Sequence, residues 1–166
     1  MTKKKINKTN AMRIVSQAKI PYQIHEYAWN ENHLDAKSAV KNGEMPTEKV
    51  FKTLVVVGNN TGPIVVCIPA DSEINFKSLA TISGNKRTEL LPLENLEKTT
   101  GYIRGGTSPI GMRKHYPTYL AKEAELLETI IVSAGRRGLQ VELKPTDLKA
   151  LTRAKFAAVT MKSHAF

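Results

Sequence analysis

The sequence predicts an α+β domain built on a mixed sheet, and three observations support this fold class. Some segments carry apolar residues at helical spacing, whereas others alternate or run together as strands do. Two runs of β-branched residues flank the turn at 59–62 and have the pattern of a hairpin. No repeat and no linker rich in Pro, Gly or Ser divides the 166 residues, so we expect a single domain, residues 1–166. The hairpin and the interspersed helices favour a mixed sheet over regular βαβ repetition.

The N-terminal part of the chain predicts a helix, a strand and a second helix. Thr9 and Asn10 are N-cap residues for a helix whose apolar side chains fall on one face. Residues 22–27 (YQIHEY) alternate as a strand does. Asp35 is a suitable cap for a short helix that reaches residue 40.

The hairpin is the clearest element in the sequence. Its first strand is residues 49–58 (KVFKTLVVVG), and its second is residues 63–70 (PIVVCIPA). Apolar side chains point to both faces of the first strand, which is typical of a central, buried strand.

Helices and strands also alternate beyond the hairpin. One helix covers residues 76–83 after a cap at Asp71 or Asn75, and another covers residues 92–100 and stops at Gly101. Two strands joined by Arg-Arg-Gly follow, and then a helix and a last apolar stretch. These elements are residues 127–135, 139–145, 146–152 and 156–160, in that order.

The charge of the chain favours a polyanionic partner. A net charge of +10 attracts nucleic acid, although the same excess of Lys and Arg also serves solubility alone. No apolar run is long enough to cross a membrane, and no apolar segment follows the basic N-terminus as it would in a secretory signal. We therefore expect a cytoplasmic protein that does not bind a membrane.

Cysteine and histidine indicate neither a metal centre nor a thiol nucleophile. Cys67, the one cysteine, lies in an apolar run and has the character of a small buried hydrophobic residue. The four histidines lack the spacing with which one local element gathers zinc. No Ser-His-Asp, Cys-His or paired-carboxylate arrangement is recognisable, and we expect no metal and no cofactor.

Lys52 is the residue that physical reasoning singles out. It lies among the apolar residues of the first hairpin strand, and lysine is seldom buried unless it is paired or used. One interpretation is a lysine near the end of the strand that extends its ammonium group to water. The other is a lysine at a cleft edge that binds a phosphate or polarises a carbonyl group. Both remain open on these residues alone.

The segment 101–117 (GYIRGGTSPIGMRKHYP) begins where a helix is expected to end. Its paired glycines, Gly105 and Gly106, permit a tight backbone and the close approach of another group. The glycine spacing fits neither a P-loop nor a dinucleotide-binding motif, which excludes a nucleotide triphosphatase. Backbone N–H groups and the hydroxyls of Thr107 and Ser108 remain as a binding surface, and a plain capped turn remains as the alternative.

Three ordered motifs resemble the YbaK/EbsC family, the free-standing relatives of the editing domain in bacterial prolyl-tRNA synthetases. They are VFKTLVV, GYIRGGTSPIG and VSAGRRGLQVELKPTDL, and the similarity covers nearly the whole chain. The resemblance implies a mixed, partly barrel-like sheet with flanking helices. It also implies a deacylase that removes cysteine from Cys-tRNA(Pro), and from Cys-tRNA(Cys), with the acceptor end of the tRNA as substrate and prolyl-tRNA synthetase as a partner.

The resemblance also assigns residues to the site. Lys52 takes the position of the family's essential lysine, which engages the terminal adenosine and the ester. The substrate-binding positions are Tyr27, Gly105, Gly106, Thr107, Ser108, Pro109, Ser133, Gly135 and Asp147. Charge and position favour tRNA backbone contacts from Arg104, Arg113, Lys114, Arg136 and Arg137, with Lys86 and Arg87 in another loop.

The mechanism that the resemblance implies needs no nucleophile from the protein. The cysteine thiol of the substrate attacks its own ester and gives a thiolactone and free tRNA, while the protein supplies position and charge. Thr107 departs from the family pattern, in which Cys, Ile or another small or apolar residue is common, and the amino-acid preference therefore stays open. The alternatives are a deacylase for another amino acid such as alanine, and a non-catalytic module that binds tRNA or a synthetase.

Overall fold

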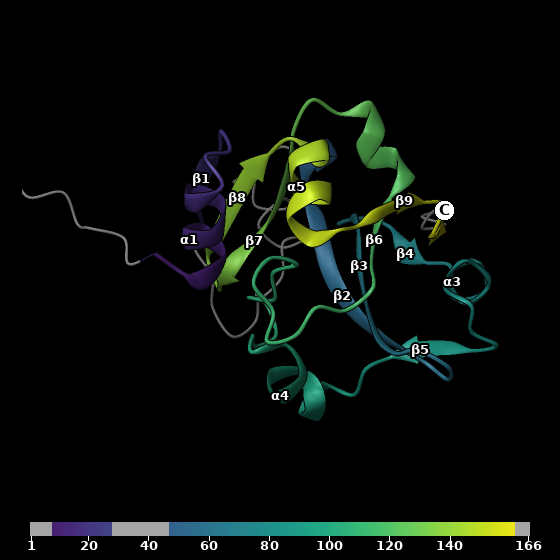
Figure 1. Ribbon diagram of the computed structural model, residues 1–166. Helices are drawn as coiled ribbons and strands as arrows, with labels where there is room; N and C mark the ends of the chain where they lie inside the picture. Colours follow the sequence, from purple (N-terminus) through teal and green to yellow (C-terminus); the bar gives the residue numbers. More distant parts are fainter. Residues whose placement is uncertain (1–7, 28–46, 162–166) are drawn as a thin grey trace, which may run out of the picture.

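The computed structural model describes residues 8–27 and 47–161, and Figure 1 shows helices and strands mixed along this part of the chain. The α+β class is confirmed. The helix expected at residues 35–40 lies outside the described residues. None of the described helices is long and apolar enough to cross a membrane.

The first helix, α1 (Asn10–Gln17), begins as predicted. The Thr9 hydroxyl oxygen accepts a hydrogen bond from the Met12 backbone N–H at 3.1 Å. The same hydroxyl donates to the Ala134 carbonyl oxygen at 2.5 Å, which ties the start of the helix to a strand far along the chain.

A three-stranded antiparallel sheet has the order β1 (Gln23–Glu26), β8 (Leu139–Leu143), β7 (Ile130–Arg136). Strands β7 and β8 form the predicted pair around Arg-Arg-Gly, while β1 joins β8 from the N-terminal end of the chain. Side chains that face each other across β1 and β8 therefore come from segments more than 100 residues apart.

A five-stranded mixed sheet contains the predicted hairpin. Its order is β5 (Thr88–Leu90), β2 (Phe51–Gly58), β3 (Gly62–Pro69), β6 (Thr118–Ala121), β9 (Lys155–Ala157). The β2–β3 and β2–β5 pairs are antiparallel, whereas β3–β6 and β6–β9 are parallel. Strands β5 and β6 were not predicted.

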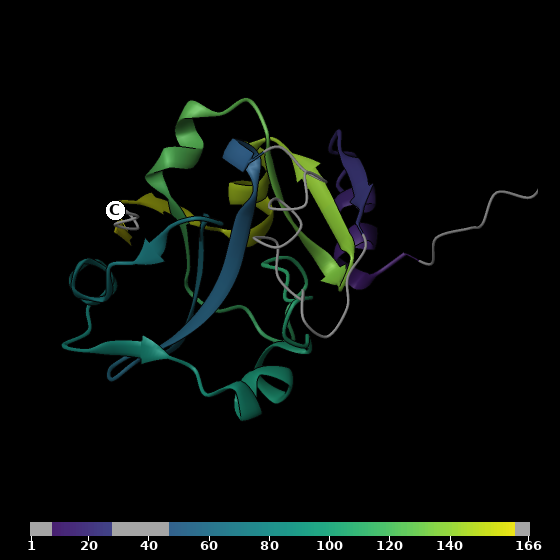
Figure 2. The ribbon, with the colours of Figure 1, turned by 180° about the vertical axis from the view of Figure 1, so that it is seen from behind.

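The expected barrel-like character does not extend to closure. Among the described strands, β5 and β9 are the two edges of the five-stranded sheet and do not pair with each other. Val50, just before β2, forms a parallel bridge to Ile131 of β7 and connects the two sheets. In Figures 1 and 2, β2 crosses the middle of the molecule, with β7 and β8 on one side and α3 (Phe76–Ser83) and β5 on the other.

The remaining elements are short. Helix α3 is capped by the Asn75 side chain and ends at Gly84, which has a φ of 78°, so Asn75 rather than Asp71 begins it. The helix predicted at 92–100 is a 3-10 turn followed by one α-helical turn that stops at Gly101. The short elements are η1 (Thr47–Lys49), β4 (Glu73–Ile74), α3 (Phe76–Ser83), η2 (Leu93–Asn95), α4 (Leu96–Thr100), η3 (Lys122–Leu126), α5 (Pro145–Thr152) and β10 (Thr160–Met161).

Candidate functional site

A cavity of about 460 Å³ lies where β2, the segment 90–96, the loop 101–111 and the β7–β8 pair come together. We call residues 101–111 the glycine loop. The apolar part of its lining, which we call the apolar wall, includes Leu54, Leu90, Leu91, Leu93 and Leu96. The polar part, which we call the polar wall, includes Lys52, Arg104, Gly105, Thr107, Ser133 and Gln140.

The cavity brings together five of the residues predicted for the site. Lys52 comes from β2, Ser133 comes from β7, and the glycine loop contributes Arg104, Gly105 and Thr107. Lys52 is half-buried on its strand. Lys52 therefore lies at a cavity, and its role in binding a phosphate or polarising a carbonyl group stays a prediction.

The other predicted substrate-binding residues do not line this cavity. Tyr27 is buried in a small apolar cluster with Val50, Ala70 and Ile131. Asp147 lies in the first turn of α5. The remaining members that lie outside the lining are Gly106, Ser108, Pro109 and Gly135.

Side-chain contacts hold the glycine loop in its shape. The Tyr102 hydroxyl donates to the Ile110 carbonyl at 2.5 Å, and burial raises the pKa of Tyr102 to about 12, so this donor keeps its proton at neutral pH. The Ser108 hydroxyl is fully buried and accepts from the Ile110 N–H at 3.2 Å. Gly105 has a φ of 84°, a conformation that a side chain rarely allows.

The basic residues predicted to contact tRNA fall into two groups. Arg104, Arg113, Lys114 and Arg136 are exposed. Arg137 is half-buried, and its Nε donates to the Arg104 carbonyl oxygen at 2.8 Å, so it fastens the glycine loop to the β7–β8 turn. At least part of the Arg137 guanidinium thus has a structural role.

Gln140 was missed by the sequence predictions. It lines the cavity, is 2% exposed and lies directly opposite Ser133 in the β7–β8 pair. Its Oε1 atom has no hydrogen-bond partner among residues 8–27 and 47–161. A buried acceptor without a partner is costly, which makes Gln140 a candidate to accept a hydrogen bond from a ligand. The only signal in the sequence was one amide in the apolar run LQVEL.

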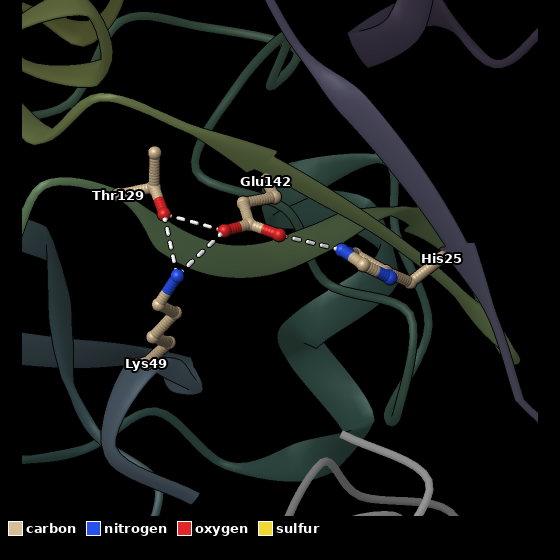
Figure 3. A network of polar contacts seen from close by, with 4 residues as sticks. All are labelled: His25, Lys49, Thr129 and Glu142. Atoms are coloured by element: carbon tan, nitrogen blue, oxygen red, sulfur yellow. Dashed lines mark hydrogen bonds and ion pairs between the residues drawn. The ribbon is translucent and has the colours of Figure 1, made fainter. Parts of the chain in front are cut away.

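A network of polar side chains supports the sheet beside the cavity (Figure 3). Glu142 follows Gln140 by two residues on β8, so both side chains leave the same face. Its carboxylate accepts from His25 at 2.7 Å, from Lys49 at 3.2 Å and from the Thr129 hydroxyl. The network thus joins β1, β8 and the turn that precedes β2.

The carboxyl group of Glu142 is strongly acidic. Burial alone raises its pKa, but the hydrogen bonds from Thr129, His25 and Lys49, with the charge of Lys49, outweigh burial and lower the pKa from 4.5 to about 2. Glu142 is therefore charged at neutral pH and holds these elements together.

Cys67 is not suited to nucleophilic attack. It is 1% exposed in β3, and burial raises its pKa to about 12 despite the hydrogen bond with Thr53. The thiolate is the reactive form of cysteine, and it is essentially absent at neutral pH for such a group.

The fold and the cavity define an α+β protein in which a strand lysine and a glycine loop line one cavity. The described lining contains no histidine, cysteine, aspartate or glutamate. A sequence model of the aminoacyl-tRNA editing domain matches residues 30–151. The chain belongs to this family of aminoacyl-tRNA editing domains.

One curated relative is similar along its whole length. It is the "Putative Cys-tRNA(Pro)/Cys-tRNA(Cys) deacylase EbsC" of Enterococcus faecalis, which is 55% identical over 163 residues, or 98% of this chain and 99% of the relative. The predicted membership of the YbaK/EbsC family is confirmed by this similarity and by the domain match.

Solved structures share the fold. The crystal structure of a "putative trans-editing enzyme for prolyl tRNA synthetase" is 19% identical, with a TM-score of 0.77, and the match covers 94% of this chain and 99% of that one. The crystal structure of a hypothetical protein is 21% identical, with a TM-score of 0.80, and the match covers 92% of this chain and 100% of that one.

Proposed function

We propose that this protein is an aminoacyl-tRNA deacylase that removes cysteine from mischarged Cys-tRNA(Pro). The observation that carries the proposal is the polar wall of the cavity, where Lys52, Gly105 and Ser133 meet from three separate segments. The name of the 55% identical relative, a Cys-tRNA deacylase, supports the choice of cysteine.

The cysteine thiol of the substrate acts as the nucleophile. Its sulfur forms a bond to the ester carbonyl carbon, the bond from that carbon to the ribose oxygen breaks, and the thiol proton ends on the ribose oxygen. The products are a thiolactone and a tRNA with a free 3′ end. The composition of the described lining supports this route, because it offers no histidine, cysteine or carboxylate as nucleophile or base.

The protein contributes charge and position. The Lys52 ammonium stabilises the negative charge that develops on the carbonyl oxygen and on the leaving ribose oxygen. The apolar wall excludes water and strengthens this interaction. Gln140 accepts a hydrogen bond from the substrate's amino group, which orients the thiol for attack over a short distance.

The acceptor end of tRNA(Pro) reaches the cavity across a basic surface. Arg104 lines the cavity, Arg113 and Lys114 are exposed just after the glycine loop, and Arg136 is exposed at the β7–β8 turn. These residues and Arg137 contact phosphates. Binding through phosphates has little sequence preference and depends steeply on salt.

We infer further that the chain is one editing domain throughout.

Selection of tRNA(Pro) comes from association with prolyl-tRNA synthetase, because a phosphate-binding surface alone does not identify a tRNA. Gel filtration of the protein with the synthetase, with and without tRNA(Pro), tests this partner: a ternary complex supports it, and separate elution in both cases contradicts it.

A panel of tRNA(Pro) charged with Cys, Ala, Ser or Pro tests the function. Selective hydrolysis of the Cys ester supports the proposal, preference for Ala replaces it with an alanine deacylase, and no hydrolysis favours a binding module. Ser-tRNA(Pro) is the matched control for the chemistry, since serine differs from cysteine only in the nucleophilic atom. Cys-tRNA(Pro) alkylated on sulfur must also survive, and its hydrolysis would refute the thiolactone route.

A further inference from the structure

A second cavity, of about 510 Å³, lies between α3, β5 and the end of β2. Three cationic side chains line it, Lys77, Lys86 and Arg87, against one carboxylate, Glu89. All three cations are exposed, and none of them is in an ion pair within the described part of the chain. The cavity is therefore a site of concentrated positive charge on a protein of net charge +10.

The backbone that carries two of these cations is held in place. The Asn59 Oδ1 atom accepts from the backbone N–H of Lys86 at 2.9 Å and from that of Arg87 at 2.8 Å. The Asn59 N–H donates in return to the Arg87 carbonyl at 3.2 Å. Lys77 projects from the first turn of α3 on the other side of the cavity. A ligand meets a preorganised group rather than the ends of a loose loop.

The cavity also contains an exposed aromatic ring. Phe76 opens α3, lines the cavity and is 36% exposed, so part of its side chain is accessible to a ligand there. The Thr88 hydroxyl donates to the Phe76 carbonyl at 2.8 Å and fixes the backbone at that point. Aromatic rings next to cations are the arrangement with which proteins bind single-stranded nucleic acid, because a base stacks on the ring while the phosphates contact the cations.

Strand β5 connects this cavity to the candidate active site. Thr88 and Glu89 line the second cavity, whereas Leu90 and Leu91 line the first. Val57, near the end of β2, also lines the second cavity and Val55 lines the first, so the two cavities follow one another along the paired strands β2 and β5. No further described strand covers β5 on its outer side, and a chain leaving one cavity can pass over this edge to the other.

We propose that the second cavity binds the single-stranded acceptor end of the tRNA, on the 5′ side of the nucleotide that carries the amino acid. Its phosphates contact Lys77, Lys86 and Arg87, and one base stacks on Phe76. This proposal rests on the proposed function, since it takes an aminoacylated tRNA as the substrate of the first cavity. It adds a binding site that the glycine loop does not include.

Binding of uncharged tRNA(Pro) to variants of the cavity tests the proposal. In the triple variant Lys77→Gln, Lys86→Gln, Arg87→Gln, the dissociation constant rises about tenfold or more. The slope of a plot of log Kd against the logarithm of the salt concentration falls by about 2. Phe76→Ala raises the dissociation constant at least about fivefold with no change of slope. The matched control neutralises Lys122, Lys144 and Lys155, which are exposed and line neither cavity.

A small substrate separates this proposal from the proposed function. Hydrolysis of cysteinyl-adenosine, which is too short to reach the second cavity, stays at the wild-type rate in the triple variant while KM for Cys-tRNA(Pro) rises. If the triple variant binds tRNA like the wild type, or no more weakly than the control variant, the proposal is wrong. A wild-type protein that hydrolyses no aminoacyl ester refutes the proposed function, and the tRNA-binding comparison still decides the role of the second cavity.

Discussion

Gly106 lies in close contact with the backbone of Arg137. A Cβ atom at position 106 would be 3.0 Å from the Arg137 nitrogen and 3.2 Å from the carbonyl carbon of Arg136. The neighbours of Gly106 in the chain, Gly105 and Thr107, both line the candidate active site. Gly106 therefore allows the backbone of the glycine loop to pack against the backbone of Arg136 and Arg137. This contact fixes the position of Gly105 and Thr107 in the polar wall.

Gly106→Ala is expected to destabilise the protein and impair the site together. Backbone atoms cannot move aside as a flexible side chain can, so the free energy of unfolding falls by about 1–3 kcal/mol, and kcat for cysteinyl-adenosine falls as well. Urea denaturation and hydrolysis assays measure the two effects. Gly62→Ala is the control: it has a φ of 73° but no atom within 4 Å of the added Cβ, so it loses about 1 kcal/mol and keeps kcat. A Gly106→Ala protein with wild-type stability and kcat would contradict the contact.

Lys52→Met is expected to lower kcat about 100-fold while leaving the fold intact. Methionine retains an apolar stem of similar length, whereas the charge that stabilises the developing oxyanion is lost. Single-turnover hydrolysis of Cys-tRNA(Pro) measures the effect, and Lys122→Met provides the control for loss of one exposed lysine. An undiminished rate in Lys52→Met would remove this residue from the mechanism.

Gln140→Leu is expected to separate stability from activity. Leucine removes the buried Oε1 atom that has no partner among the described residues, so the free energy of unfolding stays the same or rises by about 1 kcal/mol. The same change removes the acceptor for the substrate's amino group, and kcat/KM falls about tenfold or more. Thermal denaturation and hydrolysis assays on one preparation test both effects. A variant that is destabilised and fully active would show that Gln140 only supports the sheet.

The stability of the protein is expected to fall in acid because of Glu142. The pKa of this group is lowered from 4.5 to about 2 in the folded protein, so its contribution is complete above pH 4.5 and is lost as the pH falls through about 2. Glu142→Gln lowers the free energy of unfolding at pH 7 by about 1–3 kcal/mol and flattens the profile between these pH values. Urea denaturation across this range, with the exposed Glu125→Gln as control, measures it. An unchanged profile in Glu142→Gln would assign the acid sensitivity to other groups.

Cys67→Ala is expected to retain full kcat. A thiol whose pKa is about 12 and whose sulfur is buried in β3 takes no part in attack on the ester. The variant loses about 1–2 kcal/mol of stability through the small void that it leaves. Loss of turnover without loss of folded protein would show that the enzyme's own thiol reacts.

Local signals explain which elements could be predicted. Helix α3 has a cap at Asn75 and a stop at Gly84, and the hairpin has β-branched runs around a short turn. Each of these signals acts within about ten residues, so a single sequence contains it. Strands β5 and β6 escaped prediction because they have three and four residues, too few to display a period, and their pairing partners are distant in the chain.

The candidate site was predictable only in part, for the same reason. Lys52 stood out as a cation in an apolar strand, and the paired glycines indicated a tight backbone. Gln140 did not stand out, because a single amide in a strand normally faces water, and only the packing of the β7–β8 pair against β2 places it in the cavity.

The sequence by itself determined the α+β class, the basic charge, the hairpin and the family to which the three motifs belong. The tertiary structure decided that Lys52, Gly105 and Ser133 share one cavity, that Gly106 packs on a backbone turn, and that Asp147 lies outside the cavity lining. Caps, turns and β-branching act between neighbours in the chain. A cavity is formed by packing of segments that are far apart, and its composition depends on register and on the approach of backbones.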